Sequence, residues 1–354
     1  MTLLLLFRII ASYVGSIEVE EGCAPRTGLI LLNLLGRLGN NHFQIAFARR
    51  LAKELCWDVI SRQHWQASFL TNDTDYCFPN ALLPQEAISD ELKDYLEMDE
   101  GVLTALDERT RSPSNNKNIG DWVKQLERQG KAWKCEAGSC NHNGASVNRV
   151  LARIKNRRSK IRLVHLQAFF INSELMLEGG DNQHWLEINP SCCHHEPPEN
   201  AVVIHVRHFW ERGADGFNQK FTIGVYKDLL KHYNLTTNPV WVVCEPKAVD
   251  IQLVQDMRRE LKAVIHTGDD PIDAHCILRK AKTLVTSVSS TFSQSAAYFS
   301  VTASDMQVHC PVHRLRRPEI TLLVPHWKYH LVHKSKKRIK MFDVDHERMR
   351  EEVA

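Results

Sequence analysis

The fold is decided by a stretch near the start of the chain, Leu29–Phe43, which reads LILLNLLGRLGNNHF. The apolar run from Leu29 to Leu35 predicts a buried strand, and Gly36 and Gly39 predict a turn. Apolar side chains then recur at every fourth position from 43 to 55, so residues 40–56 are predicted to form an amphipathic helix. The order strand, glycine turn and helix is typical of α/β proteins.

This glycine turn also suggests a ligand site. Glycine lets a ligand approach the backbone closely, and the start of the following helix offers N–H groups to an anionic or hydroxyl-rich ligand. A nucleotide-sugar or phosphate site is therefore one interpretation. The alternative is a turn without a ligand, which many α/β proteins have at such a position.

The second half of the chain alternates between short β-branched runs and helical stretches. Strands are predicted at 202–206, 240–243, 264–266, 283–288 and 306–309, and helices at 224–233, 249–261, 271–281 and 293–299. Such alternation predicts a parallel, doubly wound sheet, in which ligands bind at the carboxyl ends of the strands.

The length of 354 residues suits two domains, and the breaker-rich stretch 187–200 marks the predicted boundary between them. From about 68 to 146 the sequence is polar and irregular, which predicts a loop-rich insertion or a small subdomain around one helix at 121–129. The predicted organisation is a leader at 1–22, an N-terminal α/β domain at 28–190, a C-terminal Rossmann-like domain at 200–333 and a charged tail at 334–354.

Charge and composition limit the classes of partner and compartment. A net charge of +3 gives no general attraction to nucleic acid, so partners have to be inferred from sites. The apolar leader is interpreted as a signal peptide or a signal anchor, with a disordered or strand-forming leader as the alternative. Sequons at Asn72 and Asn234 and ten cysteines suit the Golgi or the secretory lumen, and a cytoplasmic location stays open.

No metal site is predicted. Cys135, Cys140 and His142 resemble half of a zinc site, but a second pair with suitable spacing is missing. The adjacent residues 192–195, Cys-Cys-His-His, cannot easily direct four ligands to one ion.

Arg207 is the first candidate for chemistry, because it lies at the carboxyl end of the strand predicted at 202–206. A guanidinium there can grip a diphosphate and neutralise the charge that grows on it as a glycosidic bond breaks. The alternative is an ion pair with Glu211 or Asp215. His205 lies on the opposite strand face from Val206 and is either a ligand-binding or a core histidine.

A second candidate region is the hydroxyl-rich passage from a strand into a helix at 286–297. Ser289, Ser290 and Thr291 can surround an anion with hydroxyls and backbone N–H groups, or one of them can simply cap the helix. Asp273, in the first turn of another predicted helix, either complements the helix dipole or recognises the edge of a guanine ring.

Taken in order, these motifs resemble the landmarks of the GDP-fucose-dependent fucosyltransferases, closest to the α-1,2-fucosyltransferase family (glycosyltransferase family 11). Residues 36–41 resemble its GRLGNQ-type loop, 205–207 its HxRRxD motif and 289–293 its SSFSWW-type motif. Residues 166–170 are similar to its GYFQ-type segment and 324–327 to its C-terminal Pro-x-Trp. The resemblance spans about residues 29 to 330.

The resemblance implies a fold class of two Rossmann-like α/β lobes of GT-B type with a nucleotide-sugar cleft between them. It also implies that the domain at 28–190 is the acceptor side and that the domain at 200–333 binds the nucleotide sugar. It implies an inverting, metal-independent enzyme without a cofactor, with GDP-fucose as donor and a glycan or glycoprotein as acceptor. The implied catalytic residues are Arg207 and Asn40, and the implied donor-binding residues are Gly36, Arg37, Gly39, His205, Asp273, Ser289, Ser290 and Thr291.

The chain also departs from the family pattern. Asn41 stands in place of Gln, His208 in place of a second Arg, and Gln294-Ser295 in place of paired tryptophans. Two alternatives follow: a protein O-fucosyltransferase or other GDP-sugar transferase, and a non-catalytic relative that binds a nucleotide or glycan. The general base is unassigned, with His208, Glu211 and Asp215 as the nearby candidates.

Overall fold

The computed structural model describes most of the two predicted domains. The described residues are 27–34, 36–63, 77–78, 88–107, 113–136, 151–152, 154, 160–167, 186–208, 221–287, 290–300, 303–313, 324, 326–332 and 341–344. The predicted leader at 1–22 and the sequon at Asn72 lie outside them. Within the described residues, none of the helices combines the length and the apolar character that crossing a bilayer requires.

The N-terminal lobe is built on a parallel sheet. Its strands are β1 (Leu29–Leu34), β2 (Asp58–Gln63), β3 (Ala132–Glu136) and β4 (Leu163–Gln167), in the spatial order β2-β1-β4-β3. Its helices are α2 (Leu38–Leu55), α4 (Asp90–Tyr95), α5 (Glu100–Asp107) and α6 (Pro113–Arg128). Alternate residues of β1 enter two different apolar clusters, Ile30 and Leu32 with α2, and Leu29 and Leu31 with α4, α5 and α6.

The interpretation of residues 68–146 as a loop-rich insertion is corrected where the structure describes them. Residues 90–107 form two helices, 113–128 form a longer helix than the one expected at 121–129, and 132–136 form a strand of the sheet. These helices cover one face of the sheet. Their apolar side chains, such as Trp122 and Leu126, are buried against it.

The C-terminal lobe contains the second sheet. Its strands are β5 (Val202–Val206), β6 (Val240–Cys244), β7 (Val264–Thr267), β8 (Thr283–Val285), β9 (Gln307–His313), β10 (Lys328–Val332) and β11 (Met341–Val344). The spatial order is β11-β10-β9-β8-β5-β6-β7, and every pairing is parallel except that of β10 with β11. The strand order therefore reverses between β5 and β8, which makes this position a topological switch point. Residues 341–344, expected in a charged tail, form its antiparallel edge strand.

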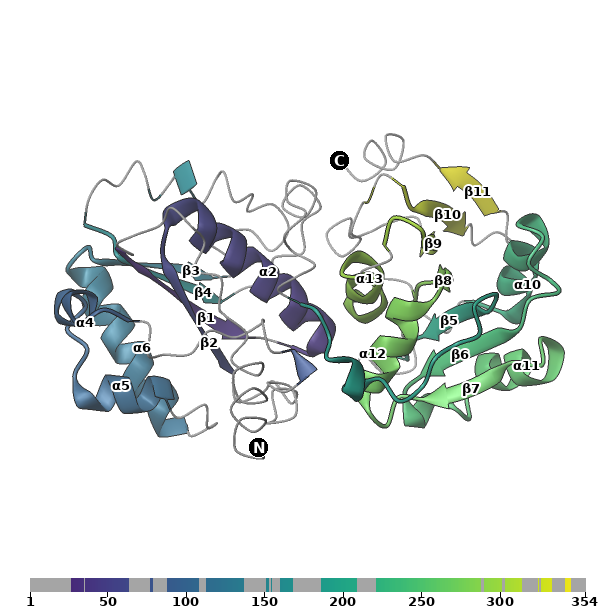
Figure 1. The fold of residues 1–354 in the computed structure, drawn as a ribbon, viewed down its shortest axis with the longest axis horizontal. Coiled ribbons are helices and arrows are strands. Elements are labelled where there is room, and N and C mark those ends of the chain that lie inside the picture. Colours follow the sequence, from purple (N-terminus) through teal and green to yellow (C-terminus); the bar gives the residue numbers. More distant parts are fainter. Residues whose placement is uncertain are drawn as a thin grey trace, which may run out of the picture.

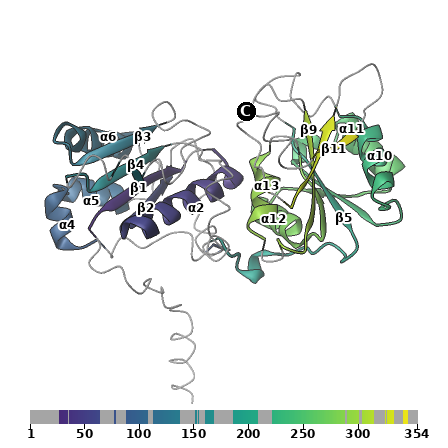
Figure 2. The same ribbon diagram turned by 90° about the horizontal axis from the view of Figure 1, so that it is seen from above.

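The helices of the C-terminal lobe cover both faces of its sheet. They are α10 (Ile223–His232), α11 (Gln252–Glu260), α12 (Pro271–Lys280) and α13 (Thr291–Tyr298), with short 3-10 turns η2 (Pro190–Cys192) and η5 (Pro246–Ala248). Figure 1 shows α12 and α13 on the face toward the N-terminal lobe and α10 and α11 on the far face. The same arrangement is visible from above in Figure 2.

The two lobes meet through helices and through disulfides. Helix α2 of the first lobe packs against α13 of the second, and one apolar cluster continues from β1 and α2 into α12 and α13. The connecting segment carries two consecutive cysteines: Cys192 is bonded to Cys77 and Cys193 to Cys276 of α12. The predicted fold class of two α/β lobes built on parallel strands is confirmed.

Candidate active site

A pocket of about 380 Å³ opens between the two lobes at the carboxyl ends of β5 and β6. It sits beside the switch point of the C-terminal sheet, where doubly wound proteins bind their ligands. Residues of both lobes line it. They are Gly36, Arg37, Leu38, Gly39, Asn40, His205, Arg207, Val243, Cys244, Glu245, Gly268, Pro271, Ala274, Ser290, Thr291 and Phe292. The structure thus brings together residues predicted from three separate motifs.

The two glycines of the opening motif have different tasks. Gly36 has a φ of 77°, a left-handed conformation that side chains with a Cβ rarely adopt. Gly39 lies against the backbone of α13, and a Cβ there would come within 2.5 Å of the Phe292 nitrogen. Gly36 therefore allows the turn, and Gly39 allows the two lobes to approach each other at the rim of the pocket.

Asn40 connects the lobes with a hydrogen bond. The Thr291 hydroxyl donates to the Asn40 side-chain oxygen at 2.7 Å, although the two residues are 251 positions apart. Asn40 is half-buried in the first turn of α2, so its amide lies at the pocket wall and is held by the opposite lobe. This side chain is therefore positioned from both sides of the cleft.

Arg207 lies directly after β5, as expected, and its side chain is largely buried. Its guanidinium is paired with the carboxylate of Glu245, which follows β6. The same Glu245 oxygen also pairs with Arg37 of the other lobe at 3.1 Å. The backbone N–H of Arg207 donates to the Ser287 hydroxyl at 3.1 Å, which fixes the end of the strand.

Three helices begin at this pocket. Helix α2 starts at Leu38, α12 at Pro271 and α13 at Thr291. The starts of α2 and α13 have neither a capping side-chain hydrogen bond nor an acidic residue in the first turn, whereas Asp270 caps α12. The partial positive charge of these two helix ends therefore favours an anion in the pocket. Together with Arg37 and Arg207, it makes the pocket suitable for an anion.

Three buried histidines lie near the contact between the two lobes. The rings of His42 of α2 and His275 of α12 are 4.7 Å apart, and His205 of β5 lies 5.4 Å from Phe292, which also contacts His275. Burial lowers the pKa of all three, that of His205 to about 3, with Arg207 adding to its shift. They are therefore neutral at neutral pH. His205 also lines the pocket, and its role in binding the donor stays a prediction.

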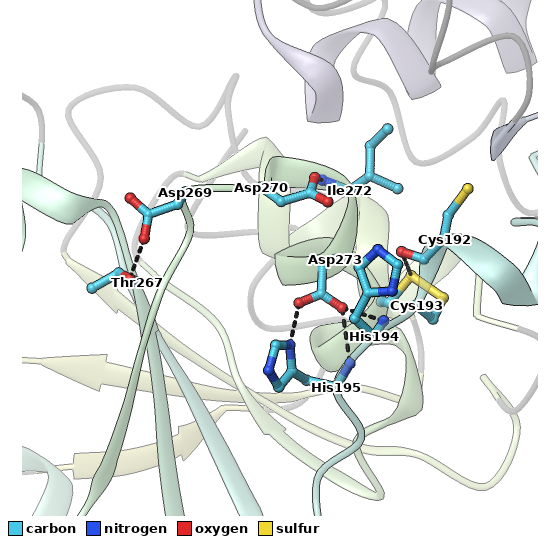
Figure 3. Close-up of polar contacts among 10 residues, drawn as sticks. Cys192, Cys193, His194, His195, Thr267, Asp269, Asp270, Ile272 and Asp273 are labelled. Atoms are coloured by element: carbon cyan, nitrogen blue, oxygen red, sulfur yellow. Dashed lines mark hydrogen bonds and ion pairs between the residues drawn. A yellow bond between two sulfur atoms is a disulfide. The ribbon is translucent and has the colours of Figure 1, made fainter.

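Asp273 is held by the segment that connects the lobes (Figure 3). Its carboxylate accepts hydrogen bonds from the backbone N–H groups of His194 and His195, at 2.6 and 3.0 Å, and contacts the His195 ring at 2.6 Å. Burial acts to raise the pKa of Asp273, but these bonds outweigh it and the pKa is lowered. The side chain is not part of the pocket lining, so the contact with guanine stays a prediction.

Of the remaining predicted residues, some lie at the pocket and others lie outside the described residues. Ser290 is the N-cap residue of α13 and is buried in the pocket wall, while Ser289, Glu211 and Asp215 lie outside the described residues. His208 is buried, and its backbone N–H donates to Glu245 at 3.1 Å. Among the described residues, no group of three or more His, Cys, Asp or Glu side chains is arranged to hold a metal ion.

Sequence reasoning did not identify Glu245. The signal was present, because Glu245 follows β6 directly, just as Arg207 follows β5, and both therefore lie at the ligand edge of the sheet. None of the motifs in the sequence contains this carboxylate, so it does not stand out as a site residue. Its position between two arginines is visible only when the two lobes are placed together.

No protein-family model and no curated protein matches this chain. Among solved structures, it is similar to POFUT1 in complex with GDP, with 12% identity, coverage of 77% of this chain and 94% of that one, and a TM-score of 0.41. It is also similar to an FUT1 mutant of Arabidopsis thaliana in complex with GDP, with 10% identity, coverage of 88% of this chain and 71% of that one, and a TM-score of 0.46. The fucosyltransferase NodZ from Bradyrhizobium is 11% identical, with coverage of 90% of this chain and 99% of that one, and a TM-score of 0.42. Likeness at these identities concerns the fold alone.

Proposed function

We propose that this protein is a glycosyltransferase that transfers fucose from GDP-fucose to a hydroxyl of a galactoside or another glycan. The observation that carries the proposal is the pocket at the switch point of the C-terminal sheet. There Arg207 and the uncapped start of α13 face Arg37 and the uncapped start of α2 from the other lobe. This arrangement suits a diphosphate bound by the C-terminal lobe and a sugar presented to the N-terminal lobe.

Leaving-group stabilisation is the main catalytic task in this proposal. The acceptor oxygen forms a bond to the anomeric carbon of fucose from the side opposite the phosphate, and the bond from that carbon to the β-phosphate oxygen breaks. The configuration is therefore inverted, and GDP leaves with the bonding electrons. Arg207 neutralises the growing charge on the β-phosphate, a task that needs no metal ion. Asn40 contacts the sugar from the opposite wall.

The acceptor hydroxyl loses a proton in this step, and the residue that takes it is not assigned. Burial and the neighbouring Arg207 lower the pKa of His208, which keeps its ring unprotonated at neutral pH but makes it a weaker base. His208 is also not part of the pocket lining. It reaches the site through its backbone, which holds Glu245.

The proposed location is the lumen of the Golgi or of another secretory compartment, with anchoring through the N-terminal leader. Two observations support it. The disulfides Cys77–Cys192 and Cys193–Cys276 are of a kind that persists in oxidising compartments. The sequon residue Asn234 is exposed, as a glycosylation site requires.

A transfer assay tests the function directly. The full chain is incubated with GDP-fucose, GDP-mannose or UDP-galactose and with a panel of galactosides and serine- or threonine-containing peptides, and released nucleotide and product are quantified. We expect turnover with GDP-fucose and a galactoside. Transfer to peptides would favour a protein O-fucosyltransferase, and tight GDP binding without any turnover would exclude catalysis.

The Arg207→Ala variant connects this activity to the pocket. Removing one charged donor to a leaving group typically costs about 10²- to 10³-fold in turnover, and we expect a loss of this size. Arg259→Ala is the matched control, because Arg259 is an exposed arginine of the same lobe whose partners, Asp256 and Glu260, lie on its own helix. Full turnover by Arg207→Ala would contradict the proposed mechanism.

A further inference from the structure

Glu245 is bound in the pocket as an anion would be. One carboxylate oxygen is paired with the guanidinium groups of Arg37 and Arg207, one from each lobe. The other oxygen accepts a hydrogen bond from the backbone N–H of His208 at 3.1 Å. Two guanidinium groups and a backbone N–H are also the partners that proteins use to bind phosphate oxygens.

The Glu245 carboxylate and a bound diphosphate would compete for the same positive charges. A nucleoside diphosphate brings more negative charge into the pocket than one carboxylate, and it needs the same two arginines. If Glu245 kept its place, two like charges would share one set of donors in a partly buried cleft, where they repel. Glu245 lies directly after β6 with its side chain 22% exposed, so part of the side chain already faces solvent.

We propose that the Glu245 carboxylate occupies the position of a donor phosphate before the donor binds, and that the diphosphate displaces it from Arg37 and Arg207. This proposal rests on the proposed function for the identity of the donor, but not for the presence of an anion subsite. The carboxylate keeps the two arginines from repelling each other and holds them in place. It also excludes anions that are too weakly charged to compete for both arginines.

The main alternative is that Glu245 stays bound to Arg207 throughout and orients it. The two roles predict opposite effects of removing the negative charge. A displaced carboxylate competes with the ligand, so Glu245→Gln strengthens anion binding. A permanent orienting partner helps the ligand, so the same substitution weakens it.

The test uses inorganic pyrophosphate and GDP as separate probes, with dissociation constants measured by calorimetry on the full chain. We expect Glu245→Gln to bind pyrophosphate about tenfold more tightly than the wild type, because one competing charge is gone. The KM for the sugar donor falls in parallel, and GDP becomes a stronger product inhibitor. Equal or weaker pyrophosphate binding by Glu245→Gln, or no binding by either protein, would overturn the proposal.

Glu260→Gln is the matched control. Glu260 is a carboxylate of the same lobe that is paired with Lys227 and Arg259 at the surface, and we expect no change in pyrophosphate binding. A second measurement needs no variant. A crystal structure of the wild type with pyrophosphate should show phosphate oxygens on Arg37 and Arg207 and the Glu245 side chain turned away, and an unchanged Glu245–Arg207 pair would overturn the proposal.

These probes separate the two proposals. Pyrophosphate carries neither a base nor a sugar, so its binding reports on the anion subsite alone. Tighter pyrophosphate binding by Glu245→Gln together with no turnover of GDP-fucose would support the role of Glu245 and contradict the proposed fucosyl transfer.

Discussion

His42, His205 and His275 place ionisable rings in an apolar interface between the lobes. All three are at most 3% exposed, and each has at least one ring nitrogen without a hydrogen-bond partner. An imidazole in such a position is tolerated when neutral and strongly disfavoured when charged. The interface between the lobes is therefore stable only at pH values at which these rings carry no charge.

The pH dependence of stability follows with a definite sign. In the unfolded chain a histidine binds its proton near pH 6.5, whereas in the folded protein burial lowers the pKa of all three, that of His205 to about 3. As the pH falls below about 6.5 the unfolded state binds more protons, so the free energy of unfolding decreases. Each such histidine contributes up to about 1.4 kcal/mol per pH unit. Urea unfolding between pH 7.5 and 5 measures this slope.

Two variants identify the residues responsible for the slope. His42→Leu removes one of the buried rings and should make the loss of stability with acid less steep. His194→Gln, which changes an exposed histidine on the connecting segment, should leave the slope as it is. The assignment would be wrong if both variants had the wild-type slope.

The sequence was sufficient to place a residue at the ligand edge of the sheet where the end of a single strand defines that place, whereas the roles of these residues stay predictions. Arg207 and His205 follow from the position and alternation of β5, and the pocket lining includes both. The pairing of Asn40 with Thr291 could not be predicted, because it joins residues 251 positions apart and depends on how the lobes dock. The partners of Asp273 could not be predicted either, because His194 and His195 are almost 80 positions away in the sequence.

At the scale of elements, the contact between α2 and α13 depends on a single missing side chain. Gly39→Ala would place a Cβ 2.5 Å from the backbone nitrogen of Phe292, so the helices would have to separate. We expect a loss of about 1–3 kcal/mol in the free energy of unfolding, typical of overpacking, together with weaker nucleotide binding. Denaturant titration and GDP calorimetry measure the two effects.

Gly120 provides the control for this substitution. It lies within α6, far from the pocket in sequence, and a Cβ there would meet nothing within 4 Å. Since alanine is the better helix former, Gly120→Ala should stabilise the protein by about 0.5–1 kcal/mol. Destabilisation by both substitutions to a similar extent would show that the close approach at Gly39 is not the cause.

Elements were predicted best where their pattern was local. The strands β5 and β6 and the helix α12 were expected within one residue of their observed bounds, because β-branched runs and a proline at the helix start define them. Helix α4 was missed because it has six residues and buries only Leu92, which is too short for a recognisable period. Strand β11 was missed because it follows the highly charged residues 334–340 in the sequence, and because only its pairing with β10 makes it a strand of the sheet.

For the whole molecule, the connection between the lobes is the decisive feature. Cys192 is bonded to Cys77, whose neighbour Phe78 packs on His42 of the first lobe, and Cys193 is bonded to α12 of the second lobe. The hydrogen bonds from residues 194 and 195 to Asp273 add to the second attachment. The connecting segment is therefore fixed to both lobes.

Removing one of these attachments should destabilise the protein measurably. The double variant Cys77→Ala, Cys192→Ala opens a loop of 115 residues, and we expect it to lose about 2–5 kcal/mol in the free energy of unfolding. Guanidinium titration under oxidising conditions measures the loss. Cys310→Ala, at a buried cysteine outside any disulfide, should cost less, and equal losses would argue against a contribution from the cross-link.

Attachment at two consecutive residues also limits how the cleft can open. Because Cys192 and Cys193 are neighbours in the chain, both anchors lie almost at one point, and a point fixed to two bodies acts as a pivot. The lobes can then rotate about this pivot but can hardly slide past each other. Opening of the pocket would therefore be a rotation, in which each part of a lobe moves further the more distant it is from residues 192 and 193.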